Sequence, residues 1–278
     1  MDALKLNTIW VLAKRELRST IYGVGIYLAI FISLIISSAI LQNYLRAVSR
    51  DRMLITASPL SYPLFIATTV CAIYLALASV TSIAREKDMQ TLEVLFYGPV
   101  DHTSYILSKY LKGLLSYIFI ILFLAVYFAV ASITSNLGLS VKFPGVLLLS
   151  LFLSSCVITF GIFVSTLTES VRTSILLFIG IVAGFIAIQV THGMLIEMES
   201  ANLSPPLIYL KNTLSIINNG VKWASPFYYL TEGMEAVSIG SVAKYTLSAV
   251  FSIIYSIIAL VFSILAITKK GVKRMAGE

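Results

Sequence analysis

The chain has 278 residues, of which 58% are hydrophobic and 12% are charged, whereas globular domains average about 45 to 50% and about 25%. This composition, with a mean hydropathy of +0.93, excludes an ordinary soluble protein. The net charge of +7 does not indicate a nucleic-acid-binding protein, because the basic residues flank apolar runs, where they set membrane orientation.

Six apolar runs are long enough to cross a bilayer as helices, because about 20 residues at about 1.5 Å per residue span a hydrocarbon core of about 30 Å. In chain order they cover residues 21–41, 61–84, 113–135, 144–168, 171–192 and 245–268. Glu169 and Arg172 separate the fourth run from the fifth, since burying both charges at the bilayer centre would cost roughly 5 to 7 kcal/mol. The expected fold is an all-α polytopic membrane protein in which residues 1–278 form a single transmembrane domain.

Six spans place both termini on one side of the membrane, and an excess of Lys and Arg marks the cytoplasmic side. The N-terminal stretch, the loop after the second run and the C-terminal tail hold most of the 20 Lys and Arg residues. A smaller cluster on the opposite face consists of Arg46, Arg50 and Arg52. We therefore expect a multi-pass protein of the plasma membrane with both termini in the cytoplasm.

Residues 1–20 precede the first span and have helical periodicity. Apolar residues recur there at Leu6, Trp10, Ala13 and Leu17. Basic side chains lie beside them, which suits a helix in the cytoplasmic membrane interface. A basic anchor that only fixes the orientation of the first span is the alternative.

The segment from residue 85 to residue 112 is expected to be a cytoplasmic loop with its own helix. If residues 85–96 are helical, Met89, Leu92 and Phe96 form an apolar stripe. The polar face of that helix would consist of Glu86, Gln90 and Glu93. Gly98-Pro99 then breaks the helix, and residues 103–112 can start another one that enters the third span. The periodicity is compatible with a helix that lies on lipid and with one that docks on a soluble partner.

About fifty residues separate the fifth span from the sixth, which is far longer than a simple connection. Within residues 193–244, two moderately apolar stretches are punctuated by Pro205-Pro206, Asn218-Asn219-Gly220 and Ser225-Pro226. Two short helices that re-enter the outer rim of the bilayer fit this pattern, because irregular backbone is tolerated there when protein or water covers it. A small folded cap outside the membrane is the competing interpretation.

Small residues on two spans indicate close helix contacts. Gly180 and Gly184 form a G-x-x-x-G motif in the fifth span, and Ser33 and Ser37 repeat this spacing in the first. Such faces let helices approach within one chain or between two chains. The pattern itself does not distinguish helix packing from a dimer interface.

The sequence lacks the motifs of several kinds of catalytic and binding site. It contains no G-x-x-x-x-G-K-[ST], so the chain has no P-loop and is not an ATPase of that type. It also lacks a G-x-S-x-G motif, and we expect no catalytic residues. His102 and His192 fall on opposite predicted faces, and Cys71 and Cys156 lie inside apolar runs, so no metal site is expected. The spans carry almost no ionisable residues, which an ion-coupled transporter usually needs.

The loop after the second span carries a recognisable pattern. Residues 84–100 read Ala-Arg-Glu-Lys-Asp-Met-Gln-Thr-Leu-Glu-Val-Leu-Phe-Tyr-Gly-Pro-Val. This resembles the signature of ABC-2 type permeases, the membrane subunits of a class of ABC transporters. The matching positions are Glu86, Thr91, Glu93, Pro99, Val100 and Lys109, whereas Gln90 and Ser108 replace the usual glycines. The order of six spans, interfacial helix, cytoplasmic element and long outer segment extends the resemblance over nearly the whole chain.

The resemblance implies that the cytoplasmic helix is a coupling element that inserts into a cleft of a separate P-loop ATPase subunit. The residues implied at this interface are Arg85, Glu86, Met89, Thr91, Leu92, Glu93, Phe96 and Pro99. ATP and Mg would be bound by that partner, and no cofactor by this chain. A second permease, identical or related, would complete the complex in the lipid bilayer.

The resemblance further implies an exporter whose substrate the sequence does not identify, with lipid-like, peptide or amphiphilic cargo all compatible. A complex that uses ATP to act on an external partner without transport is one alternative. A self-contained channel or secondary transporter is another, and the charge-free spans are the main objection to it.

Overall fold

The computed structural model describes residues 3–51, 60–97, 100–135, 143–197 and 205–270. Within these residues the chain forms ten helices and no strand. They are α1 (Ala3–Ile21), α2 (Val24–Asp51), α3 (Ser61–Asp88), α4 (Thr91–Tyr97), α5 (His102–Ser135), α6 (Phe143–Leu167), α7 (Val171–Glu197), α8 (Pro205–Ala224), α9 (Pro226–Ile239) and α10 (Val242–Lys270). The expected all-α fold is confirmed.

Six of these helices are long and apolar enough to cross a membrane, namely α2, α3, α5, α6, α7 and α10. They coincide with the six predicted runs but are mostly longer. The helix boundary predicted at Ile21 lies instead at Gly23, between α1 and α2, and α2 continues through Arg46 and Arg50. Likewise, α5 begins at His102, so the predicted helix over residues 103–112 is the start of the third span.

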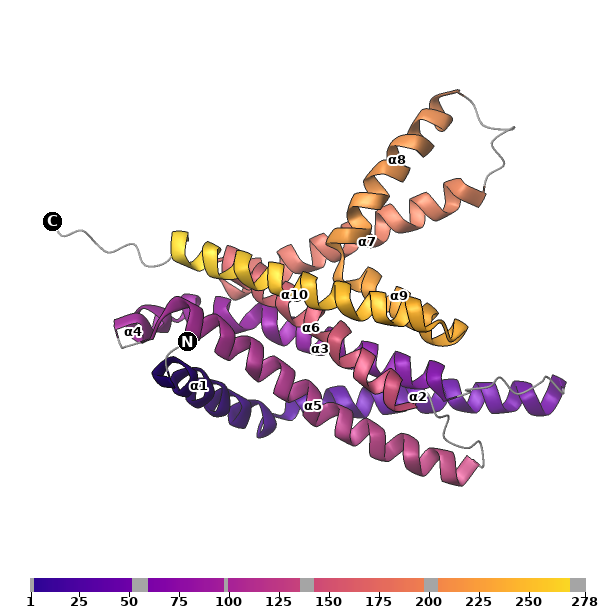
Figure 1. Ribbon diagram of the computed structural model, residues 1–278, viewed down its shortest axis with the longest axis horizontal. Coiled ribbons are helices and arrows are strands. Elements are labelled where there is room, and N and C mark those ends of the chain that lie inside the picture. Colours follow the sequence, from indigo (N-terminus) through magenta and orange to yellow (C-terminus); the bar gives the residue numbers. More distant parts are fainter. Residues whose placement is uncertain (1–2, 52–59, 98–99, 136–142, 198–204, 271–278) are drawn as a thin grey trace.

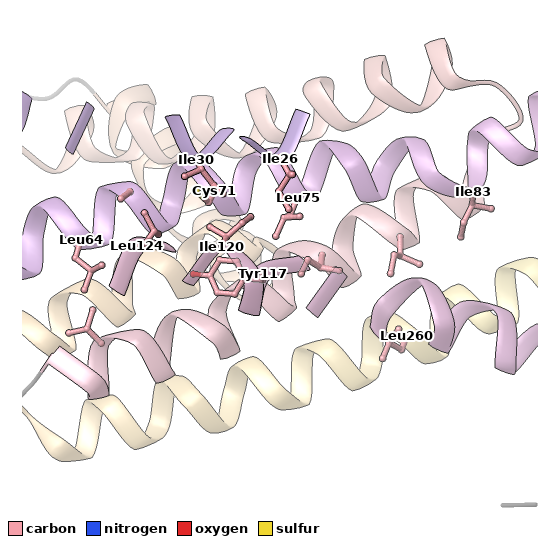
Figure 2. Packing of buried hydrophobic residues seen from close by; sticks show 14 of the residues in the cluster. Ile26, Ile30, Leu64, Cys71, Leu75, Ile83, Tyr117, Ile120, Leu124 and Leu260 are labelled. Carbon is pink, nitrogen blue, oxygen red and sulfur yellow. The ribbon is translucent and has the colours of Figure 1, made fainter. Parts of the chain in front are cut away.

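Helices α3 and α6 form the centre of the bundle. In the most apolar window of each helix, 72% of the residues of α6 and 56% of those of α3 are buried, against 11% for α7. Gly161 permits the close approach, since a Cβ atom there would lie 2.7 Å from the carbonyl oxygen of Ala76. Helices α2, α5 and α10 add the rest of the main core, in which Leu64, Tyr117 and Ile120 are fully buried (Figure 2).

Helix α1 runs alongside the first turns of α5. Lys5 pairs with Asp101 at one end of this contact, and Glu16 pairs with Lys109 further along both helices. The two helices therefore run in the same direction. Together with α4 and the C-terminal end of α10, α1 occupies one end of the molecule (Figure 1).

The long segment before the last span forms two helices with different surroundings. Helix α8 packs against α7, and this hairpin extends away from the bundle (Figure 1). Helix α9 packs on α6 and α10, where Gly233 allows close contact because a Cβ atom would lie 2.6 Å from Leu153 Cδ1.

The junction between α8 and α9 lies beside the middle of α10. The Tyr255 hydroxyl donates to the carbonyl oxygen of Ala224 at 3.0 Å, and the Tyr229 hydroxyl donates to that of Trp223 at 3.2 Å. These hydroxyls satisfy carbonyls that the end of α8 leaves without a partner inside its own helix.

Candidate functional site

The segment predicted to be one helix over residues 85–96 is broken in the structure, so that prediction is wrong. Helix α3 ends at Asp88, and the Met89 and Gln90 amides donate back to the carbonyls of Arg85 and Lys87, both at 3.0 Å. Gln90 has φ of 56°, in the left-handed region that favours glycine. The helix is interrupted there, and α4 begins at Thr91.

This break divides the predicted apolar stripe. Leu92 is 7% exposed and belongs to the main core. Phe96 also faces inward, with its ring centroid 4.4 Å from that of His102 and 5.5 Å from that of Tyr105. Met89 is instead 60% exposed. The stripe therefore does not form one continuous outward face, since two of its three members stabilise the loop against the bundle.

Other residues form the outer face of α4. Val94 is 71% and Tyr97 is 86% exposed, and Thr91 and Glu93 are exposed beside them. The sequence pattern gave no weight to Val94 or Tyr97, because the face of Leu92 and Phe96 was expected to point outward, whereas it packs on the core. With Met89, these residues make a mixed apolar and acidic surface, here named the α4 outer face (Met89, Thr91, Glu93, Val94 and Tyr97).

Glu86 points into the protein, not along an outer polar face with Glu93 as the sequence suggested. Its carboxylate accepts a hydrogen bond from the Tyr105 hydroxyl at 2.5 Å and forms an ion pair with the Lys109 ammonium. Lys109 is only 4% exposed. A buried ammonium needs an anionic partner, because desolvation of an unpaired charge is costly. Glu86 is held inward for that reason.

Lys109 also binds Glu16 of α1, at 2.6 Å from ammonium to carboxylate. The side chain of Glu16 is 16% exposed and that of Glu86 is 26% exposed. One cation thus joins α1, α3 and α5 through two carboxylates. A groove of about 560 Å³ between α1 and α3 opens onto this triad, and Arg85 and Met89 also line it. Glu16 was not among the sequence-predicted site residues, because no local motif marks it.

The end of α3 is also tied to α6 and α7. The Lys87 ammonium donates to the carbonyls of Thr166 at 2.6 Å and Thr168 at 2.9 Å. Two backbone groups of α3 bond to side chains of its neighbours. The Ser165 hydroxyl of α6 accepts a hydrogen bond from the Ala84 amide at 2.9 Å, and the Ser174 hydroxyl of α7 donates one to the Val80 carbonyl at 2.9 Å. The Ala84 amide and the Val80 carbonyl are an i and i−4 pair, which an α-helix joins by a backbone hydrogen bond. Hydroxyls from α6 and from the start of α7 therefore contact the backbone hydrogen bonds of α3 just before α4.

The remaining predicted site residues are dispersed. Arg85 is exposed at the end of α3, and the Thr91 hydroxyl donates to the Glu86 carbonyl at 3.2 Å. Pro99 lies outside the described residues. Among the residues that the structure describes, no three potential metal-ligating side chains come together.

The two small-residue faces differ in their surroundings. Ser33 and Ser37 are fully buried, and the Ser37 hydroxyl donates to the Pro63 carbonyl at 3.1 Å, so they pack α2 against α3. Gly180 and Gly184 instead face open space, with nothing within 4 Å of an added Cβ atom. The G-x-x-x-G face of α7 therefore contacts no part of the described chain.

The polar contacts of this site connect an exposed surface to several spans. Its ion pairs and hydrogen bonds join α1, α3, α5, α6 and α7 next to the α4 outer face.

Residues 10–272 match a family model described as "ABC-2 family transporter protein". No curated protein matches the chain.

Proposed function

Because this chain belongs to the ABC-2 family of transporter proteins, we propose that it is the membrane subunit through which a separate ATPase exports an amphiphilic substrate. Family membership and six apolar helices make the chain a multi-pass membrane protein and a permease subunit of an ABC transporter. The ATPase contact, the direction, the substrate and the membrane orientation are the parts that we propose.

The observation that carries the coupling proposal is the two-sided character of α4. Its inner side is fixed in the core by Leu92, while Val94 and Tyr97 remain 71% and 86% exposed at the end of the molecule. Large apolar side chains with a central acidic residue are typical of a short docking surface, in which burial supplies affinity and charge supplies specificity. We assign this surface to a cleft in a P-loop ATPase that binds ATP and Mg.

The polar contacts behind α4 give a route for movement. When ATPase closure displaces the α4 outer face, the α3 end moves with it, since only Met89 and Gln90 separate the two helices. Glu86 then acts on Lys109 of α5, and Lys87 acts on the turn that follows α6. The closed and open states of the spans would differ in how α3 sits against these neighbours.

A second permease copy or a related permease is the proposed partner within the membrane. The Gly180 and Gly184 face of α7 supports this, because it is exposed along a helix whose apolar window is only 11% buried. Small residues let two helices approach closely in lipid. We place this face at the contact between the two permeases.

The proposed orientation puts α1, α4 and both termini in the cytoplasm of a cell whose plasma membrane holds the complex. The excess of Lys and Arg at this end supports it. Export is the direction implied by the family resemblance, and the aliphatic and aromatic character of the spans is compatible with amphiphilic cargo.

Site-specific photo-crosslinking in the native membrane tests the coupling surface. A photoreactive amino acid at Val94 is expected to trap the ATPase subunit, because this side chain points outward. The same group at Leu92, two residues away but 7% exposed, should give little product. Leu176, which is 70% exposed on α7, serves as an exposed control away from α4. Equal ATPase capture at Val94 and Leu176, or none at Val94, would contradict the proposal.

A further inference from the structure

A cavity of about 200 Å³ lies between α8, α9 and α10. Lys222 and Trp223 line it from α8, Tyr228 and Glu232 from α9, and Phe251 from α10. The Trp223 and Phe251 rings meet edge to face, with centroids 5.1 Å apart. The cavity thus combines an aromatic wall with one cationic and one anionic side chain, although it lies far from the α4 outer face.

The two charges in this cavity do not neutralise each other. None of the ion pairs among the described residues includes Lys222 or Glu232. The Lys222 ammonium lies over the Tyr228 ring, 5.6 Å from its centroid, and the Tyr228 hydroxyl donates to Glu232 at 2.6 Å. Burial and this hydrogen bond raise the pKa of Tyr228 to about 12, so the phenol keeps its proton. A phenol ring therefore separates a cation from an anion, and each can bind an opposite charge.

Counted along α10, the cavity lies at the level expected for the proposed outer membrane boundary. Leu247, Ser248 and Phe251 line it from α10, and the hydrocarbon boundary counted from Lys269 falls near residue 249 at 1.5 Å per residue. Aromatic and amphipathic side chains such as Trp223 and Tyr228 are characteristic of this zone. A ligand here would meet lipid head groups on one side and acyl chains on the other.

The size of the cavity indicates which part of a ligand it accepts. Pockets for whole drug-sized ligands measure about 300 to 1,000 Å³, so about 200 Å³ suits only a small polar group. From its edge, exposed apolar residues continue along one face of α10 at helical spacing, namely Leu247, Val250, Ile254 and Ile258. This face leads from the cavity into the hydrocarbon region and can hold an acyl chain.

We propose that the cavity binds the zwitterionic head group of a phospholipid-like amphiphile, with the phosphate at Lys222 and the amine at Glu232. The aromatic rings contribute cation–π contacts to the amine. The acyl chains follow the exposed face of α10. That this lipid is the exported cargo rests on the proposed function, whereas its binding does not.

Tryptophan fluorescence measures this binding directly. The chain has two Trp residues, so Trp10→Phe leaves Trp223 as the single reporter in the cavity wall. The purified full chain is placed in phosphatidylglycerol nanodiscs that contain a small fraction of phosphatidylethanolamine brominated near the top of its acyl chains. Several-fold stronger quenching than with equally brominated phosphatidylglycerol is expected. Equal quenching by the two lipids would overturn the proposal.

Variants in the Trp10→Phe background locate the effect. Lys222→Gln and Glu232→Gln should each weaken phosphatidylethanolamine binding about tenfold, whereas Lys222→Arg should keep the preference. Lys14→Gln is the matched control, because Lys14 is exposed on α1 and does not line the cavity. Unchanged preference in both Lys222→Gln and Glu232→Gln would contradict the assignment.

Soluble phosphoethanolamine separates a lipid site from a site for a free zwitterion. At the same concentration it should not displace the brominated lipid, because it lacks the chains that follow α10. Displacement at equal concentration would assign the cavity to a water-soluble ligand and overturn the lipid proposal. The quenching measurement needs no ATPase, so failure of the coupling proposal and failure of this one give different results.

Discussion

Lys109 of α5 is 4% exposed, and its ammonium donates to the carboxylate of Glu86, near the end of α3. The two residues lie on the helices that precede and follow α4. Their ion pair therefore holds the base of the segment that carries the proposed docking surface, and Glu16 extends the pair to α1.

Replacing Lys109 with Met should destabilise the protein. The change removes the one ammonium that contacts both Glu16 and Glu86, whose side chains are only 16% and 26% exposed, and leaves Lys112 as the nearby positive charge. Removing one partner of a fully buried pair costs about 3 to 5 kcal/mol, and partial exposure reduces this to about 2 kcal/mol here. The free energy of unfolding in mixed detergent micelles measures it.

The matched control is Lys5→Met. Lys5 and Asp101 also join α1 to α5, but their side chains are 50% and 58% exposed. Exposed pairs contribute about 0 to 1 kcal/mol, so this variant should be nearly as stable as the wild type. Equal losses in the two variants would show that burial of Lys109 has no special effect.

The second prediction concerns the stability of substitutions at Gln90, in the turn between α3 and α4. Among the described residues, Gln90 is the one non-glycine residue with positive φ, at 56°. A left-handed conformation costs roughly 1 to 2 kcal/mol for most residues, but glycine adopts it freely. The free energy of unfolding of the Gln90→Gly variant should therefore be at least about 1 kcal/mol higher than that of the Gln90→Val variant.

Met89→Val is the control for this turn, because Met89 is exposed and has φ of −86°. It should cost much less than Gln90→Val. If Gln90→Val and Gln90→Gly are equally stable, the left-handed turn between α3 and α4 is contradicted.

Gly161→Ala should weaken the centre of the bundle. The new methyl group would lie 2.7 Å from the Ala76 carbonyl oxygen and 3.0 Å from Ser79 Cβ, so α3 and α6 must separate. Overpacking of this kind costs about 1 to 3 kcal/mol. Gly184→Ala, which meets open space inside α7, should not lower the unfolding temperature of the isolated chain, because Ala favours the helix over Gly. A neutral Gly161→Ala variant would argue against the close α3–α6 contact.

Membrane orientation can be tested by cysteine labelling of intact cells. Cys71 and Cys156 are both buried, so they should contribute little background. A membrane-impermeant maleimide should react with Asn212→Cys from outside, and with Val94→Cys only after permeabilisation, because both positions are exposed. The opposite pattern would reverse the proposed topology.

The spans could be predicted from the sequence because charge-free runs of membrane length have few other solutions. The break at Gln90 could not, since helical periodicity carries no information about a single left-handed residue. The partners of Lys109 were also missed, because Glu16 and Glu86 lie 93 and 23 positions away. Periodicity identifies a polar face, but it does not show whether a given carboxylate meets water or a buried cation.

The outer segment shows a similar limit. Its punctuation by Pro205-Pro206 and Ser225-Pro226 predicted two short helices, and α8 and α9 are present. Their contrasting positions depend on Gly233, which fits against Leu153, and on the Tyr255 hydroxyl, which satisfies the Ala224 carbonyl. Both contacts join residues that are far apart in the chain, so no local pattern reports them.

The most direct test of the account is affinity purification of the tagged chain in mild detergent, followed by mass spectrometry and an ATPase assay of the isolated complex. The wild type should retain a stoichiometric P-loop ATPase, and Glu93→Lys, on the exposed side of α4, should lose most of it without impairing membrane insertion. Lys211→Glu, on α8, reverses a charge far from α4 and should retain the ATPase. A preparation without ATPase in several detergents, or equal ATPase recovery with Glu93→Lys, would contradict coupling through α4.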